Sequence, residues 1–135
     1  MKKVSFTVPG EPTGKGRPRF YNGHSITPSK TKSYEAEVKF WYLQENKGIM
    51  IDGEVIADIK AYYQIPKSVS KKTRQQMLDG EIRPTKKPDL DNVAKAILDA
   101  LNGLAYHDDS EVVELNIGKY WSDSPRVEVT LMERG

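Results

Sequence analysis

The chain contains no cysteine and only two histidines, and this limits the metals that it can bind. Without cysteine, disulfides and thiolate metal sites are excluded. His24 and His107 are far apart in the sequence, so a histidine-rich zinc site is not expected. Any metal is therefore predicted to be a hard cation that is held by oxygen ligands.

Long apolar runs are also missing. No stretch approaches the roughly 20 apolar residues that are needed to cross a bilayer, and MKKVSFTVPGEP at the N-terminus lacks the apolar core of a signal peptide. We therefore predict a soluble, cytoplasmic protein with no membrane partner. A chain of 135 residues is long enough for one hydrophobic core, and we predict a single domain over residues 1–135.

Charge is unevenly distributed, although the net charge is only +2. Residues 12–33 include five basic side chains and no acidic one, and residues 67–87 include seven basic side chains against two acidic ones. Residues 89–114 reverse the sign, with seven carboxylates against Lys95. Basic segments beside an acidic cluster suit a polyanionic partner with a cation bound between partner and protein. An ordinary mixed-charge surface is the alternative.

The spacing of apolar residues predicts an α+β fold. Alternating apolar residues predict strands near residues 4–8, 55–65, 113–117 and 127–131. Helical spacing and capping signals predict helices over residues 31–46, 70–78 and 89–101. The link at residues 122–125 is short enough for an antiparallel hairpin between the last two strands. We predict one domain in which helices pack on a mainly antiparallel sheet.

The segment KKPDLDNVAKAILDALNG contains the most informative of the predicted helices. Because an α-helix turns about 100° per residue, its aliphatic side chains share one face, and Asp91, Lys95 and Asp99 form a stripe on the other. A purely structural interpretation is available for this pattern. In that interpretation Asp89 caps the helix and Asp91 forms an ion pair with Lys95.

A second acidic pair favours a functional interpretation. Asp108 and Asp109 lie in the loop YHDDSEV, directly before a predicted strand. If this loop folds back beside the first helical turn, these carboxylates converge with Asp89 and Asp91. Mg²⁺ would relieve their repulsion, and it would support phosphodiester hydrolysis by activating water and polarising the phosphoryl group. Lys95 is the candidate for stabilising the developing negative charge.

These motifs resemble the RusA family of Holliday-junction resolvases. The resemblance is carried by DLDN with the following Lys95, by DALNG and HDDSEV in that order, and by PGEPTGKGRPRF near the N-terminus. It implies a RusA-like fold and a homodimeric crossover junction endodeoxyribonuclease. Such an enzyme binds four-way DNA junctions and nicks two strands symmetrically during DNA recombination and repair. It uses Mg²⁺, for which Mn²⁺ can substitute, and no small-molecule cofactor.

The resemblance also assigns roles to single residues. It implies that Asp89, Asp91 and Asp109 are essential acids, that Lys95 is the catalytic lysine, and that Asp108 matches a neighbouring acidic position. The predicted metal ligands are therefore Asp89, Asp91, Asp108 and Asp109. Because members of the family often occur in phages and prophages, a prophage origin is also expected.

Two basic segments are candidates for DNA contacts. Lys15, Arg17 and Arg19 alternate with glycine and proline, which favour an extended loop that approaches a backbone closely. Side chains on such a loop can contact successive phosphates. Lys86 and Lys87, before the carboxylate helix, form a second candidate set. A solvated connector and a polar surface are the alternatives for these segments.

Two rival interpretations stay open. Some nucleases place Pro-Asp before a strand that bears Asp/Glu-x-Lys. Here Pro88-Asp89 follows Asp58-Ile59-Lys60, which is the reverse order. The other rival is a non-catalytic protein that binds branched nucleic acid, in which the aspartates serve only as helix caps and turn formers.

Overall fold

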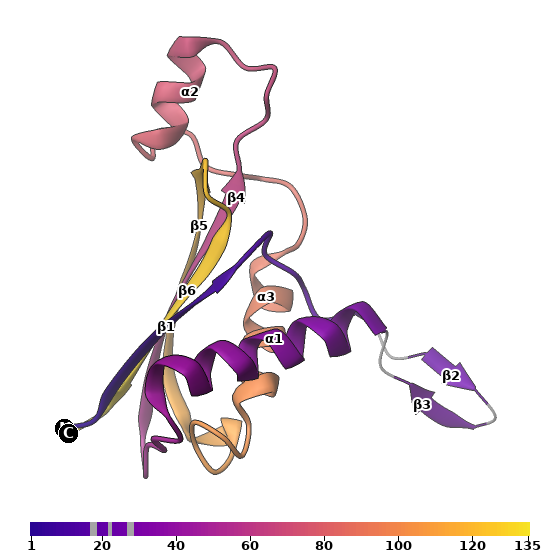
Figure 1. Ribbon diagram of the computed structural model, residues 1–135, viewed down its shortest axis with the longest axis vertical. Helices are drawn as coiled ribbons and strands as arrows, with labels where there is room; N and C mark the ends of the chain where they lie inside the picture. The colour runs from indigo at the N-terminus through magenta and orange to yellow at the C-terminus, as the bar shows by residue number, and fades with distance from the viewer. Residues whose placement is uncertain (17–18, 22, 27–28) are drawn as a thin grey trace.

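The computed structural model describes residues 1–16, 19–21, 23–26 and 29–135, and the side chains of residues 1–16, 23 and 29–135. The strands are β1 (Lys3–Pro9), β2 (Arg19–Tyr21), β3 (His24–Ile26), β4 (Val55–Gln64), β5 (Val112–Ser122) and β6 (Arg126–Glu133). The helices are α1 (Ser29–Asn46), α2 (Lys71–Leu78), α3 (Leu90–Leu101) and a short 3-10 helix, η1 (Asp109–Glu111). Figure 1 shows their arrangement.

The main sheet has the strand order β1-β6-β4-β5. β6 pairs antiparallel with both β1 and β4, and β5 pairs parallel with β4. β2 and β3 form a separate antiparallel pair, which extends from the N-terminal end of α1 (Figure 1). The α+β class with a mainly antiparallel sheet and packed helices is therefore confirmed.

The predicted hairpin between the last two strands is wrong, because β4 lies between β5 and β6. The link between these strands passes the end of β4, where the backbone N–H of Ile65 donates to the Ser122 carbonyl at 3.1 Å. The inward-facing residues of β4 are fully buried from Val55 to Tyr63. A strand this apolar is stabilised more in the middle of a sheet than at an edge, and the hairpin would have left it at the edge.

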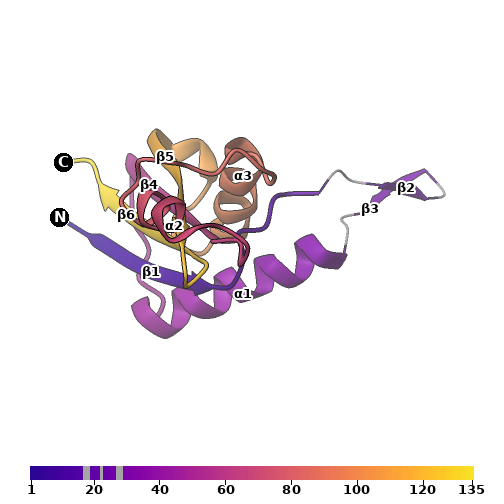
Figure 2. The same cartoon turned by 90° about the horizontal axis from the view of Figure 1, so that it is seen from above.

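Helices α1 and α3 lie side by side against one face of the sheet (Figures 1 and 2). The core forms between them and the inward-facing residues of β1, β4 and β6. α2 stands apart, at one end of the sheet (Figure 1). None of the helices in the described ranges is long and apolar enough to span a membrane.

Helix α3 follows its sequence pattern closely. Val93, Ile97 and Leu101 are fully buried against the core, and burial of each such side chain stabilises the fold by about 1.5–3 kcal/mol. The helix ends before Gly103, whose φ of 75° is a left-handed conformation that favours glycine. This packing fixes the helix and directs its polar stripe away from the sheet.

Candidate active site

The loop between β1 and β2 is held against the start of α3. The backbone N–H of Lys15 donates to the Asn92 carbonyl at 2.9 Å, and that of Gly16 donates to Thr31 Oγ1 in α1 at 2.9 Å. A Cβ atom on Gly14 would lie 3.0 Å from the Cβ atoms of both Pro88 and Asn92. The backbone of the loop therefore passes close to the start of α3 at Gly14.

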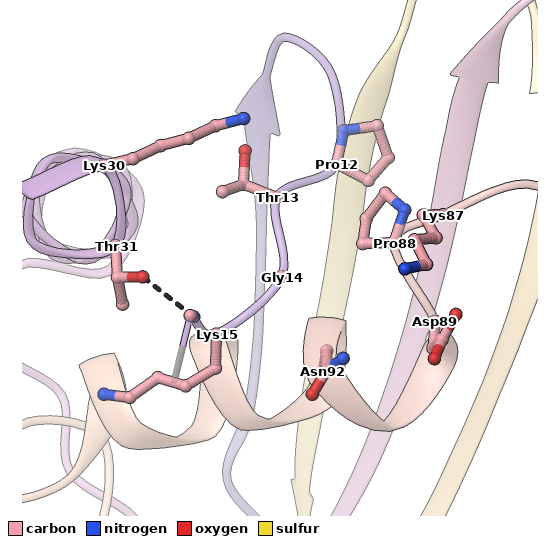
Figure 3. Close-up of a pocket in the computed structure, with 11 residues that line it drawn as sticks. Pro12, Thr13, Gly14, Lys15, Lys30, Thr31, Lys87, Pro88, Asp89 and Asn92 are labelled. Carbon is pink, nitrogen blue, oxygen red and sulfur yellow. Dashed lines mark hydrogen bonds between the residues drawn. The ribbon is translucent and has the colours of Figure 1, made fainter. Parts of the chain in front are cut away.

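An open groove of about 710 Å³ lies between this loop and the N-terminal ends of α1 and α3 (Figure 3). Its lining is Pro12, Thr13, Gly14, Lys15, Gly16, Lys30, Thr31, Lys87, Pro88, Asp89 and Asn92. Lys30 and Lys87 have exposed side chains, and neither takes part in the ion pairs found among the described side chains. The groove can therefore hold a phosphate group beside a carboxylate.

Asp89 and Asp91 lie at the start of α3, where the purely structural interpretation predicts a helix cap and an ion pair with Lys95. Asp89 occupies the N-cap position, yet its side chain makes no capping hydrogen bond to this helix, all of which is described. Asp91 is exposed, and no ion pair among the described side chains joins it to Lys95. The capping hydrogen bond of Asp89 and the ion pair between Asp91 and Lys95, which the purely structural interpretation predicts, are therefore not found among the described side chains.

Tyr63 positions the residue that precedes Asp89. Its hydroxyl donates a hydrogen bond to the Pro88 carbonyl at 2.6 Å. Burial raises the pKa of Tyr63 to about 12, and the nearby charges of Asp89 and Glu11 add to this rise. Tyr63 therefore stays protonated at neutral pH and keeps its hydrogen bond to the Pro88 carbonyl.

Asp108, by contrast, is a cap. Its carboxylate accepts hydrogen bonds from the backbone and the hydroxyl of Ser110, while the backbone N–H of Asp108 donates to Glu111 Oε1 at 3.2 Å. The hydrogen bonds from Ser110, side chain first, lower the pKa of Asp108. This reciprocal capping box starts η1. The engagement of the carboxylate counts against the predicted metal role of Asp108.

Asp109 begins η1, which contacts α3. Burial raises the pKa of Asp109, and the charges of Asp108 and Asp99 raise it further. Asp91 precedes Asp99 by eight residues, which corresponds to about 12 Å along a helix axis. Asp109 is thus at the opposite end of the helix from the first acidic pair.

The predicted meeting of Asp109 with Asp89 and Asp91 is therefore wrong within one chain. The loop after α3 is held near the end of the helix by two hydrogen bonds, from the Tyr106 hydroxyl to the Leu98 carbonyl at 2.6 Å and from the Gly103 N–H to the Tyr106 carbonyl at 3.0 Å. Within the described ranges, no group of three His, Cys, Asp or Glu side chains is placed to hold a metal ion.

Comparison with known proteins assigns the family. A family model described as "Endodeoxyribonuclease RusA" matches residues 9–132, which include the groove and both acidic groups. The chain belongs to the RusA endodeoxyribonuclease family. It is also 45% identical over 139 residues to the "Uncharacterized protein YqaN" of Bacillus subtilis (strain 168), and the match covers 98% of each chain. The resemblance that was inferred from the motifs is confirmed.

The two carboxylates at the start of α3 form a donor set that suits Mg²⁺, although they do not enclose it. Asp89 and Asp91 supply two carboxylates within one helical turn. Mg²⁺ usually retains several waters and is bound through one or two carboxylates together with substrate phosphates. Two carboxylates beside a groove with exposed lysines therefore suit a metal site that DNA would complete.

The basic residues predicted to contact DNA have different positions in this RusA-family chain. Lys87 lines the groove, whereas the ammonium of Lys86 lies 5.6 Å from the centre of the Trp121 ring. Lys15 is directed inward, to carboxylates of α1 and α3. Arg17 is not among the residues that the structure describes. Arg19 belongs to β2, but its side chain is not described.

Lys30 is a groove residue that the sequence did not single out. It belongs to the basic stretch over residues 12–33, and it lies in the first turn of α1, facing the loop (Figure 3). The sequence around a single lysine in the first turn of a charged helix does not distinguish it as a binding residue. Only the approach of α1 to α3 makes it part of the groove.

The two aspartates at helix starts should respond differently to removal of their side chains. An N-cap aspartate replaced by alanine costs about 1 kcal/mol of unfolding free energy, and we expect Asp89→Ala to cost less than half of that. Asp108→Ala should shift the urea midpoint more, because its side chain does cap. Equilibrium unfolding in urea measures both. A larger loss at Asp89 than at Asp108 would restore the capping role to Asp89.

Proposed function

We propose that this chain is a Mg²⁺-dependent endodeoxyribonuclease that resolves four-way DNA junctions. The observation that carries the proposal is the groove in which Lys30 and Lys87 lie beside Asp89 at the start of α3, in a chain of the RusA family. Lysines bind phosphates without reading sequence, and carboxylate oxygens are the ligands that Mg²⁺ prefers. Together they suit cleavage of a DNA backbone.

In the proposed mechanism, Lys30 and Lys87 hold the DNA backbone in the groove, and Asp89 and Asp91 hold the metal. When bound, Mg²⁺ or Mn²⁺ lowers the pKa of a water ligand and stabilises charge on the phosphoryl group. Lys95, exposed one turn after Asp91, stabilises the negative charge that develops during cleavage. The family resemblance makes Asp109 a further catalytic carboxylate.

We also propose that two copies of the chain act together. Symmetric cleavage of two strands calls for two active sites that are related by a two-fold axis, which a homodimer supplies. Because phosphate contacts carry little sequence information, the dimer selects its substrate mainly by the shape and deformability of the junction.

The test is cleavage of a synthetic four-way junction beside a linear duplex of the same sequence, with Mg²⁺, with Mn²⁺ or with a chelator. We expect paired nicks at symmetric positions of the junction with either metal. We expect none with the chelator and much slower cutting of the duplex. A chain that binds the junction but cuts it with neither metal would instead be the non-catalytic binding protein.

A further inference from the structure

The segment over residues 83–88, which leads from α2 toward α3, passes around β5, an edge strand of the main sheet. Arg83 lies on the face opposite the helices, with its guanidinium 4.0 Å from the centre of the Tyr120 ring. Lys86 lies on the helix-covered face, with its ammonium 5.6 Å from the centre of the Trp121 ring, which packs against the core. Consecutive side chains of a strand point to opposite faces. The segment therefore crosses from one face of the sheet to the other before α3 begins.

Lys119 of β5 is joined to this segment at two points. Its backbone carbonyl accepts a hydrogen bond from Arg83 Nε, and its ammonium donates to the Lys86 carbonyl. The ammonium also lies 5.2 Å from the centre of the Tyr63 ring. Lys119 takes part in none of the ion pairs found among the described side chains. Its ammonium is therefore directed to a neutral backbone group, close to the groove.

A second anchor comes from β4. The Tyr63 hydroxyl donates to the Pro88 carbonyl at 2.6 Å. Lys119 and Tyr63 thus hold the carbonyls of the two residues on either side of Lys87, which lines the groove. The Pro88 carbonyl also shares its peptide group with the nitrogen of Asp89. The sheet therefore fixes the backbone that leads into the groove at two consecutive places.

Asp89 depends on this backbone because α3 does not hold its side chain. The helix begins at Leu90, and the Asp89 carboxylate makes no capping hydrogen bond to it. α3 fixes the Asp89 backbone from one side only, through the hydrogen bond from the Val93 N–H to the Asp89 carbonyl at 3.0 Å. The segment that Lys119 and Tyr63 hold fixes it from the other side. The orientation of the carboxylate in the groove therefore depends on both.

We propose that Lys119 is a positioning residue that, together with Tyr63, holds residues 86–88 so that Asp89 enters the groove in the orientation that cleavage requires. The proposal rests on the proposed function, which gives Asp89 its role in metal-dependent cleavage. Misplacing a catalytic group by about 1 Å can slow a reaction about a hundredfold. The alternative role for Lys119 is a direct phosphate contact, which would change the affinity for DNA and not the rate.

Two variants remove one anchor each. Lys119→Met removes the donor and keeps the aliphatic stem, and Tyr63→Phe removes only the hydroxyl. We expect each to slow cleavage at saturating junction about tenfold or more. The affinity for the junction, measured in chelator, should change less than about twofold, because the flexible side chain of Lys87 can still reach a phosphate. Lys119→Arg, which keeps a charged donor, should recover most of the lost rate.

The matched controls are Lys3→Met and Tyr62→Phe. Lys3 is exposed on β1, and Tyr62 is stacked on Tyr120 on the face opposite the helices, so neither lines the groove. Both controls should cleave within about twofold of the parent, since residues outside the site act independently. Cleavage by Lys119→Met at the rate of Lys3→Met would overturn the proposal. A weaker affinity at an unchanged rate would overturn it in favour of a phosphate contact.

A second readout does not require cleavage. A carbonyl that accepts a hydrogen bond polarises the peptide group that it shares with the N–H of the next residue. In the metal-free protein, the ¹⁵N amide resonance of Lys87 should therefore move in Lys119→Met, and that of Asp89 should move in Tyr63→Phe. Neither resonance should move in the two control variants.

The two readouts separate failure of this proposal from failure of the proposed function. A parent that does not cleave the junction would overturn the proposed function, while the amide resonances would still decide whether Lys119 holds the segment. An unmoved Lys87 resonance in Lys119→Met would end the proposal even if the parent is a nuclease. A moved resonance at the parental cleavage rate would end it as well. Lys119→Gln takes the place of Lys119→Met if that variant does not fold.

Discussion

Asp91→Asn is expected to abolish metal-dependent cleavage of a four-way junction while junction binding persists or becomes tighter. Asparagine keeps the shape of the side chain but removes the charge that holds the metal in the proposed mechanism. Loss of a group that stabilises transition-state charge typically slows a reaction by about 10²–10³. Binding should not suffer, because one negative charge that faces the DNA phosphates disappears. Asp91 is exposed, so the change should leave the fold intact.

Asp79→Asn is a matched control for this variant. Asp79 is the C-cap residue of α2 and lies outside the groove, so its replacement changes the charge equally and should leave the rate within about twofold of the parent. Single-turnover rates in Mg²⁺ and affinities in chelator measure the two effects separately. If Asp91→Asn cuts as fast as Asp79→Asn, Asp91 does not belong to the site.

The elements whose apolar spacing is regular could be predicted from the sequence. The buried face of α3 and the alternating burial of side chains along β4 both follow from the spacing of apolar residues, because side chains at those spacings share a face. The same rule cannot give the order of strands in a sheet. Residues 122–125 permit a hairpin, yet they also reach across one strand, and the burial of β4 decides between these arrangements.

The position of Asp109 could not be predicted, because it depends on two hydrogen bonds within the segment that follows α3. The Tyr106 hydroxyl and the Gly103 N–H fix the loop beside the end of α3. Neither bond has a signature in residue spacing. The sequence shows two acidic pairs that a cation could join. The number of residues between them allows the second pair to lie near either end of α3.

The different roles of Asp89 and Asp108 did have a signal in the sequence. A capping box places Glu or Gln three residues after the cap. Asp108 is followed at that distance by Glu111, whereas Asp89 is followed by Asn92. The pattern therefore favoured Asp108 as the structural cap and left Asp89 available for chemistry, which agrees with the hydrogen bonds of the structure.

Charge counting was less informative for the basic residues. Lys15 and Lys30 belong to one basic stretch, but Lys15 neutralises carboxylates inside the protein while Lys30 lines the groove. A lysine's role depends on whether a carboxylate from another element lies within its reach. That information comes from the packing of α1 against α3 and not from composition.

Replacing both groove lysines, in the variant Lys30→Gln/Lys87→Gln, is expected to weaken junction binding about tenfold and to reduce its salt dependence. Each lysine that neutralises a phosphate contributes about one unit to the slope of log affinity against log salt concentration. The double variant should therefore lose about two units. Dissociation constants measured between about 50 and 200 mM salt, in chelator, give both the affinity and the slope.

Lys39→Gln/Lys47→Gln is the control for net charge, since both lysines are exposed toward the other end of α1 and neither lines the groove. Long-range attraction weakens equally in the two variants, so only the groove variant should show the loss of slope that belongs to direct phosphate contacts. An equal loss in both would mean that the lysines act through overall charge alone. An unchanged slope in the groove variant would place the DNA backbone on a different surface, and with it the scissile phosphate away from Asp89.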